Sequence, residues 1–168
     1  MTDERRVGTT NGSPDGGEPR WFEDGRRFEC TSCGNCCTGG EGAVWFDDDE
    51  GRAMAEVLGQ TYPEFLVRHT RMIDGHRSLN EHLTGFGHDC EFLDRESIPG
   101  KAICSVYGAR PSQCRTWPFW PELMKSKKAW ARAKRNTPCP GMDSGQLFTV
   151  EEIVARLELE RGSEEKPW

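Results

Sequence analysis

The sequence predicts an α+β fold: a small, irregular, cysteine-rich domain of short helices and one hairpin. Apolar residues make up only 35% of the 168 positions and charged residues 30%, so the hydrophobic core is thin for a chain of this length. Short apolar runs bounded by turn residues are typical of strands, and capped stretches with apolar residues at helical spacing are typical of helices. Eight cysteines provide a further means of holding such a core together.

One domain is expected, because 168 residues is close to the usual domain size. Residues 1–20 contain several Gly, Ser, Pro and Asn residues without an apolar period, and they are expected to form a disordered tail. Residues 162–168 are expected to fray. The folded domain should therefore span residues 21–161.

The first cysteines are expected in a tight loop over residues 30–37, because Gly34 and Asn35 tolerate the backbone angles of a sharp turn. Residues 43–46 follow as a predicted short strand of apolar and aromatic residues. A loop of this kind is what a cluster of metal-binding thiolates requires.

Two scaffold helices are predicted next. The acidic run 47–50 is expected to begin a helix that extends to about Leu58, since acids stabilise a helix N-terminus. These acids lack the spacing of a calcium-binding loop, which favours the capping interpretation. A second short helix is predicted over residues 62–69, with Pro63 at its start.

Residues 90–93 and 102–107 are predicted to be the two strands of the hairpin, joined through the turn-forming residues 97–100. This pairing would bring Cys90 and Cys104 near each other.

The remaining elements are helical. Residues 110–115, with Pro111 at the first position, predict a short helical turn from which Cys114 projects. A longer helix is predicted over residues 125–135, and residues 149–152 form a capping box ahead of a C-terminal helix.

The protein is expected to be cytoplasmic. Its N-terminus has no apolar stretch that resembles a signal peptide, and no segment approaches the roughly 18 apolar residues of a membrane-spanning helix. A net charge of −6 disfavours a general affinity for nucleic acid, and the sequence does not indicate a protein partner. In a reducing compartment, cysteines favour metal ligation over disulfides, and the neighbours Cys36 and Cys37 cannot readily bridge to each other.

The spacing of Cys30, Cys33 and Cys36 matches the first three positions of a bacterial ferredoxin run, where two intervening residues let successive sulfurs face one centre. The fourth spaced cysteine is missing. Its place is open to Cys139, which precedes a proline, or to another cysteine brought in by folding. Thiolate ligands favour an iron–sulfur cluster or zinc over hard cations. Eight cysteines could form two four-cysteine sites, one polynuclear site, or one site with extra thiols. The candidate metal ligands are Cys30, Cys33, Cys36, Cys37, Cys90, Cys104, Cys114 and Cys139.

Several motifs together resemble the YkgJ-type cysteine-cluster family. They are the C-x2-C-x2-C-C run, the segment that begins at Cys90, and a later block that contains Cys104, Arg110, Pro111, Cys114, Arg115, Pro118 and Phe119. The resemblance runs from about Phe28 to Gly141. It implies a zinc- or iron-chelating domain that is often described as containing iron–sulfur. The expected cofactor is therefore an iron–sulfur cluster, of the 4Fe–4S type, or zinc. The resemblance also implies that the matched cysteines are the ligands and that Arg110 and Arg115 support the site, although ion pairs with acids are an equal alternative.

Two other functions stay open. A similar cysteine motif occurs in flagellin lysine N-methylases, which makes methyl transfer an alternative and leaves enzymatic activity undecided. A basic stretch over residues 125–135 surrounds Trp130, which makes binding of nucleic acid or of a partner another alternative. A solvated helix face is the simpler interpretation of this stretch. The aromatic residues Trp117, Phe119 and Trp120 are expected to pack in the core and keep water from the metal. His88 precedes the second cysteine segment and is assigned no role.

Overall fold

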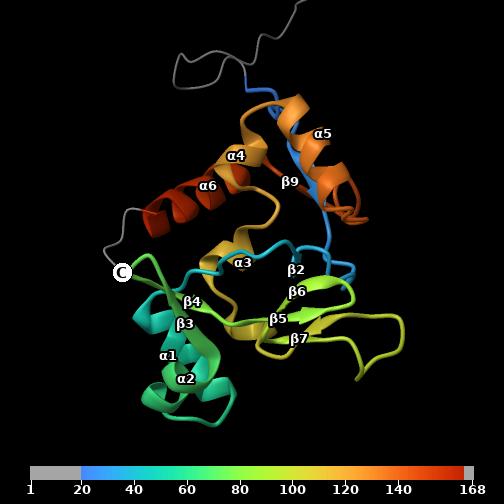
Figure 1. Ribbon diagram of the computed structural model, residues 1–168. Coiled ribbons are helices and arrows are strands. Elements are labelled where there is room, and N and C mark those ends of the chain that lie inside the picture. Colours follow the sequence, from blue (N-terminus) through green and yellow to red (C-terminus); the bar gives the residue numbers. More distant parts are fainter. Residues whose placement is uncertain (1–19, 165–168) are drawn as a thin grey trace, which may run out of the picture.

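The computed structural model describes residues 20–164, with side chains described to residue 160. The tail expected over residues 1–20 therefore lies outside the described residues apart from Arg20, as does the end of the C-terminal tail. Helices and short antiparallel strands lie in largely separate stretches of the chain (Figure 1), so the predicted α+β class is confirmed.

The helices are α1 (Asp48–Val57), α2 (Tyr62–His69), α3 (Ser112–Thr116), α4 (Pro121–Met124), α5 (Lys127–Asn136) and α6 (Val150–Glu164), with a 3-10 turn, η1, at Tyr107–Ala109. The strands are β1 (Arg26–Phe28), β2 (Thr38–Gly39), β3 (Thr70–Ile73), β4 (His76–Leu79), β5 (Glu81–Thr84), β6 (Gly87–Cys90), β7 (Leu93–Asp94), β8 (Ile103–Cys104) and β9 (Gln146–Phe148). Every predicted helix is present, and α6 continues three residues beyond its expected end.

Reciprocal caps explain why α1 and α2 begin where they do. The Asp47 side chain accepts from the backbone N–H of Glu50, whose carboxylate accepts from the Asp47 N–H in return. Thr61 and Glu64 make the same exchange at the start of α2. Each box satisfies donors that a helix terminus leaves free. The acids after Phe46 therefore serve a helix N-terminus, as predicted.

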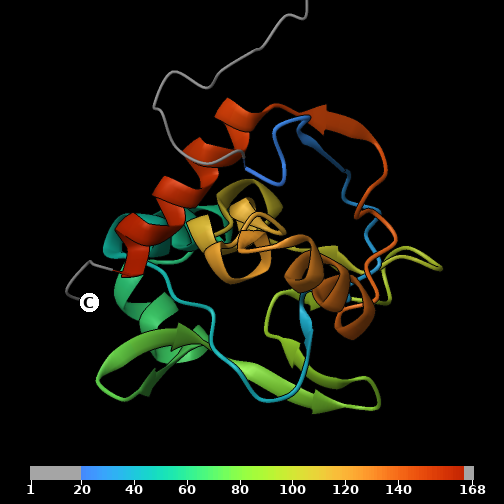
Figure 2. The same cartoon turned by 90° about the horizontal axis from the view of Figure 1, so that it is seen from above.

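Within residues 20–164, the strands form four small antiparallel sheets: β1–β9, β2–β6–β5, β3–β4 and β7–β8. The predicted hairpin is present as β7–β8, but it is shorter than expected, and Cys90 ends β6 instead of starting the hairpin. The predicted strand over residues 43–46 is reduced to a single bridge from Trp45 to Ser78. Two hairpins that the sequence did not predict, β3–β4 and β5–β6, lie along one side of the molecule when it is seen from above (Figure 2).

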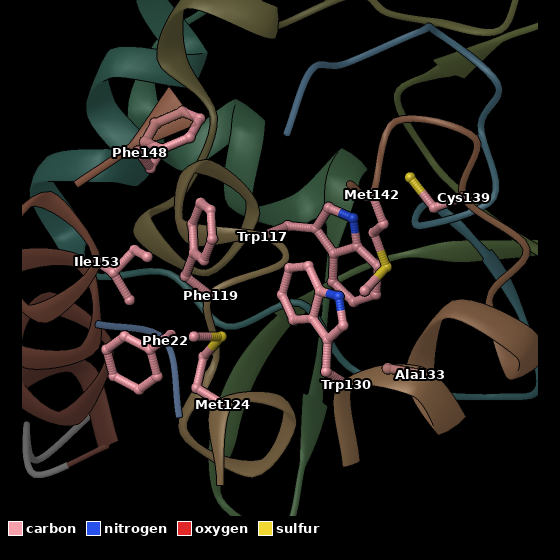
Figure 3. Close-up of a cluster of buried hydrophobic side chains, with 10 residues drawn as sticks. All are labelled: Phe22, Trp117, Phe119, Met124, Trp130, Ala133, Cys139, Met142, Phe148 and Ile153. Carbon is pink, nitrogen blue, oxygen red and sulfur yellow. The ribbon is translucent and has the colours of Figure 1, made fainter. Parts of the chain in front are cut away.

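Two separate hydrophobic cores organise the fold. The upper core lies among α4, α5, α6 and β9 and comprises Phe22, Trp117, Phe119, Met124, Trp130, Ala133, Cys139, Met142, Phe148 and Ile153 (Figures 1 and 3). The lower core includes side chains of α1 and α2 and comprises Phe46, Met54, Ala55, Phe65, Leu79, Phe92, Val106 and Ala109. Trp117 and Phe119 are buried as predicted, and Trp120 packs against the upper core while partly exposed. Helix α3 lies between the two cores (Figure 1).

Candidate metal centre

A single cavity of about 640 Å³ receives all eight cysteines. Trp117 and Cys139 of the upper core line one part of it, and Leu79, Phe92 and Val106 of the lower core line another. The cavity therefore lies where the two cores meet. None of its thiols is paired in a disulfide; they are Cys30, Cys33, Cys36, Cys37, Cys90, Cys104, Cys114 and Cys139.

The first cysteine loop is held from both sides of the cavity. The Cys37 N–H donates to the Gly34 carbonyl at 2.9 Å and closes a tight turn, in which Gly34 has a φ of +74°. The Asn35 amide donates to the Pro138 carbonyl at 2.7 Å, which ties the loop to the Cys139 segment. The Ala102 N–H donates to the Ser32 carbonyl at 2.8 Å, which ties it to β8. The loop therefore bridges two regions that are distant in the sequence.

Strand pairing places Cys37 beside Cys90. The β2–β6 register pairs Thr38 with Asp89, and the Cys90 N–H continues it by donating to the Cys37 carbonyl at 2.8 Å. The Cys90 sulfur accepts from the Phe92 N–H. A turn with an N–H aimed at sulfur suits a thiolate ligand, because it stabilises the charged form.

Cys104 and Cys114 approach the same part of the cavity from later segments. Cys104 pairs with Leu93 in the β7–β8 hairpin, and its sulfur accepts from the Val106 N–H. Cys114 lies on α3. The start of this helix is held in place by a hydrogen bond of 2.7 Å from the Ser112 N–H to a Glu50 carboxylate oxygen. The Gln113 side chain accepts from the Trp45 N–H at 2.8 Å and so docks α3 on the preceding segment.

Cys139 is buried in the upper core beside Trp117 (Figure 3). Burial is the largest influence on the Cys139 thiol and raises its pKa. The N–H groups of Gly141 and Met142 donate to the sulfur, and the Trp117 indole N–H points toward it. These three donors lower the pKa in part. The Trp117 Nε1 is buried, and the contact lies outside ordinary hydrogen-bond geometry, so this donor has no partner in the described part of the chain. A buried N–H without a partner is costly and fits a sulfur-rich group held next to it.

The surroundings of four of the thiols favour their neutral form in the metal-free protein. The neighbouring Cys36 thiol, at a sulfur–sulfur distance of 3.6 Å, and then burial raise the pKa of Cys37. Burial raises the pKa of Cys90 to about 12, and it also raises the pKa values of Cys104 and Cys114. Thiolates are the metal-binding form of cysteine, so binding of a metal by these thiols would release protons.

Three arginines lie close to the thiols. Arg110 lies 3.6 Å over the Tyr107 ring, and its charge lowers the pKa of Cys37, against the stronger influences of Cys36 and of burial. Arg115 instead pairs with Glu50 at 3.4 Å. The sequence did not predict a role for Arg95, which binds both oxygens of the Asp89 carboxylate, at 2.7 and 3.1 Å.

The basic stretch offers no stacking ring. Trp130 is buried in the upper core, where its indole N–H donates to Asp143 at 2.9 Å, and Lys134 pairs with the same carboxylate at 2.8 Å. The remaining cations on α5 therefore form a solvated helix face, the simpler of the two interpretations. His88 lines the cavity from β6.

The donor set fits zinc or iron. All eight candidate ligands are thiols, which select soft or borderline metals, and the buried Trp117 N–H adds a donor for sulfur. Within residues 20–164, no three Cys, His, Asp or Glu side chains are close enough together to bind one metal ion as they stand. In the same range, no helix has the length and apolar character needed to span a membrane.

Comparison with known proteins agrees with this chemistry. Residues 29–140 match the model of the CxxCxxCC family, described as a putative zinc- or iron-chelating domain. The matched segment contains all eight cysteines. No solved structure gives a significant match to the chain.

Proposed function

The chain belongs to the CxxCxxCC family of zinc- or iron-chelating domains, and from this we propose that its cysteines hold an iron–sulfur cluster of the 4Fe–4S type, which takes four thiolate ligands, in the cavity between the two cores. The observation that carries the proposal is the convergence of eight free thiols on one cavity. Metal binding itself follows from the family. The identity of the metal and the ligand set are the steps proposed.

The size of the cavity favours a cluster over a lone zinc ion. A structural zinc ion uses four ligands at about 2.3 Å, so its four sulfurs lie only about 3.8 Å apart. A cavity of about 640 Å³ with eight thiols around it has room for a group of many atoms. Zinc at two such sites is the alternative within the same family description.

The surrounding donors also suit a cluster. The N–H groups of Phe92 and Val106 donate to cysteine sulfurs, and the Trp117 N–H adds a donor at the opposite wall. Hydrogen bonds to sulfur and nearby positive charge raise the reduction potential of a cluster. A bound iron–sulfur cluster would supply one-electron redox chemistry at this position.

The aromatic wall has a protective role in this proposal. Trp117 and Phe92 are nearly fully buried, and both line the cavity. Apolar side chains limit the access of water to a metal site and lower the local dielectric constant. These rings would therefore slow hydrolysis and oxidation of a cluster held between them.

The test is purification without oxygen, followed by an absorption spectrum and analysis of iron, sulfide and zinc. We expect a brown protein with iron and acid-labile sulfide in equal amounts. Cys33→Ser should reduce both, whereas Thr31→Ala, a change at a nearby position that is not a thiol, should leave both unchanged. Zinc without iron or sulfide in the native protein would refute the cluster. A protein that binds neither metal would refute metal binding by the cavity.

A further inference from the structure

We propose that the eight cysteines form two separate four-thiolate centres, a proposal that rests on the function above and names the ligands of each centre. The strand set is Cys37, Cys90, Cys104 and Cys114. The knuckle set is Cys30, Cys33, Cys36 and Cys139. Each set would hold its own metal group, and the two groups would lie side by side in the cavity.

The two cores divide four of the cysteines in the same way. Cys90 and Cys104 pack against the lower core, and Cys33 packs against the upper core, to which Cys139 belongs. These four thiols therefore enter the cavity from two different walls.

Backbone contacts join the strand set. Cys37 and Cys90 are cross-strand neighbours through the 2.8 Å hydrogen bond between their main chains, and the Ser105 N–H donates to the Phe92 carbonyl at 2.9 Å beside Cys104. Cys114 joins them on α3, where the Ser112 N–H donates to Glu50 and the Gln113 side chain accepts from the Trp45 N–H, so this helix is docked on the segment that carries the lower core.

Different contacts join the knuckle set. The Asn35 amide holds the Pro138 carbonyl, and the Glu29 N–H donates to the Gly141 carbonyl at 3.2 Å, so the loop contacts the chain on both sides of Cys139. The C-x2-C-x2-C spacing then supplies three ligands from one loop, as in zinc knuckles and ferredoxins.

The double cysteine marks the boundary between the sets. Cys36 and Cys37 are adjacent in sequence, with sulfurs 3.6 Å apart, and the strand pairing of Cys37 directs it to the Cys90 side. One loop can therefore give a ligand to each centre.

Exposure distinguishes the centres. Cys30 and Cys36 of the knuckle set are exposed, whereas every member of the strand set is at least partly buried. A chelator in solution therefore reaches the knuckle centre first. Metal removal should proceed in two phases of similar amplitude.

The experiment uses the full chain loaded without oxygen with ferrous iron and sulfide. We expect the iron content of Cys30→Ala and of Cys104→Ala to fall to about half that of the native protein, whereas Thr31→Ala keeps all of it. A ferrous chelator should remove iron from the native protein in two phases, and only the slow phase should remain in Cys30→Ala.

A single shared centre gives a different result. Either substitution would then remove nearly all the iron, and chelation of the native protein would follow one phase. If Cys104→Ala does not fold, the exposed Cys30→Ala variant and the chelation of the native protein still decide between the two arrangements. A native protein that binds no metal would instead refute the function on which the two centres rest.

Discussion

Replacing Gly34 by alanine tests whether the first cysteine loop must fit closely against β8. Gly34 has a φ of +74°, and a Cβ atom there would lie 2.7 Å from the Ala102 Cβ and 3.1 Å from an Arg95 nitrogen. Gly100 provides a matched control, because it has a φ of +75° but no atom within 4 Å of the position that a Cβ would take. Both substitutions strain the backbone equally, and only the first forces the loop outward.

The expected magnitudes follow from these two terms. A left-handed backbone costs a residue with a Cβ about 1 to 2 kcal/mol, and this cost applies to both variants. Alanine also restricts the unfolded chain in both variants, so that contribution cancels in their difference. Overpacking a close contact typically costs about 1 to 3 kcal/mol more. Gly34→Ala should therefore be less stable than Gly100→Ala by about 2 kcal/mol.

The assay is urea unfolding of both variants in metal-free and metal-loaded form, together with their iron content. Gly34→Ala should also bind less iron, because the displaced loop carries four of the cysteines, whereas Gly100→Ala should bind the native amount. Equal stability of the two variants, with equal iron content, would refute the idea that this contact positions the loop.

Three further predictions concern the surroundings of the site. Trp117→Phe removes the buried indole N–H, which is proposed to donate to a sulfur of the bound cluster. Loss of one such hydrogen bond, worth about 1 kcal/mol, should lower the reduction potential of the loaded protein by about 40 mV in a redox titration. An unchanged potential would contradict the role of Trp117 as a donor. Glu50→Ala removes the acceptor of the Ser112 N–H and also half of the capping box of α1. Urea unfolding should therefore show a free energy of unfolding lower by about 3 kcal/mol. Glu50→Gln keeps an acceptor and should reduce that free energy less. Burial alone would raise the pKa of the Asp143 carboxyl, but hydrogen bonds from Lys134 and Trp130 outweigh burial and lower that pKa. The ionised Asp143 carboxylate therefore stabilises the fold above about pH 4, and this stabilisation is lost as the pH falls further. Unfolding of metal-free protein between pH 3 and 6 should therefore depend less on pH in Asp143→Asn than in the native protein, and identical profiles would contradict this account.

Local signals explain why the helices could be predicted. The capping box at the start of α6 is written in four consecutive residues, and the structure contains both of its hydrogen bonds, between Thr149 and Glu152. The acids before α1 and the proline in α2 are equally local. Such signals depend on neighbours in the chain, so one sequence is enough to find them.

The strands were harder to predict, because their stability depends on partners. β3 and β4 contain Arg and His residues and lack a clear apolar alternation, so they gave no strand signal. The turn between these strands does contain a sequence signal, because an Asp-Gly pair is a strong predictor of a two-residue hairpin turn. Asp74 and Gly75 both have the positive φ that such a turn requires.

The same distinction applies to the site. The cysteines could be chosen as candidate ligands from their spacing and chemistry. Their division between two walls depends on the pairing of β2 with β6, which no local pattern reveals. Arg95 was missed for the same reason, since its importance depends on contacts with Asp89 and with the loop at Gly34.

The pairing of β1 with β9 has a consequence for how the protein is made. Arg26 pairs with Phe148, so two segments from opposite ends of the described chain meet beside the cavity. The ribosome releases the first cysteine loop early, but Cys139 and β9 emerge only after most of the chain has been synthesised. Until then the loop has no upper wall to bind, and its exposed thiols are open to oxidation and to stray metal ions. The complete cavity can therefore form only after Cys139 and β9 have been synthesised.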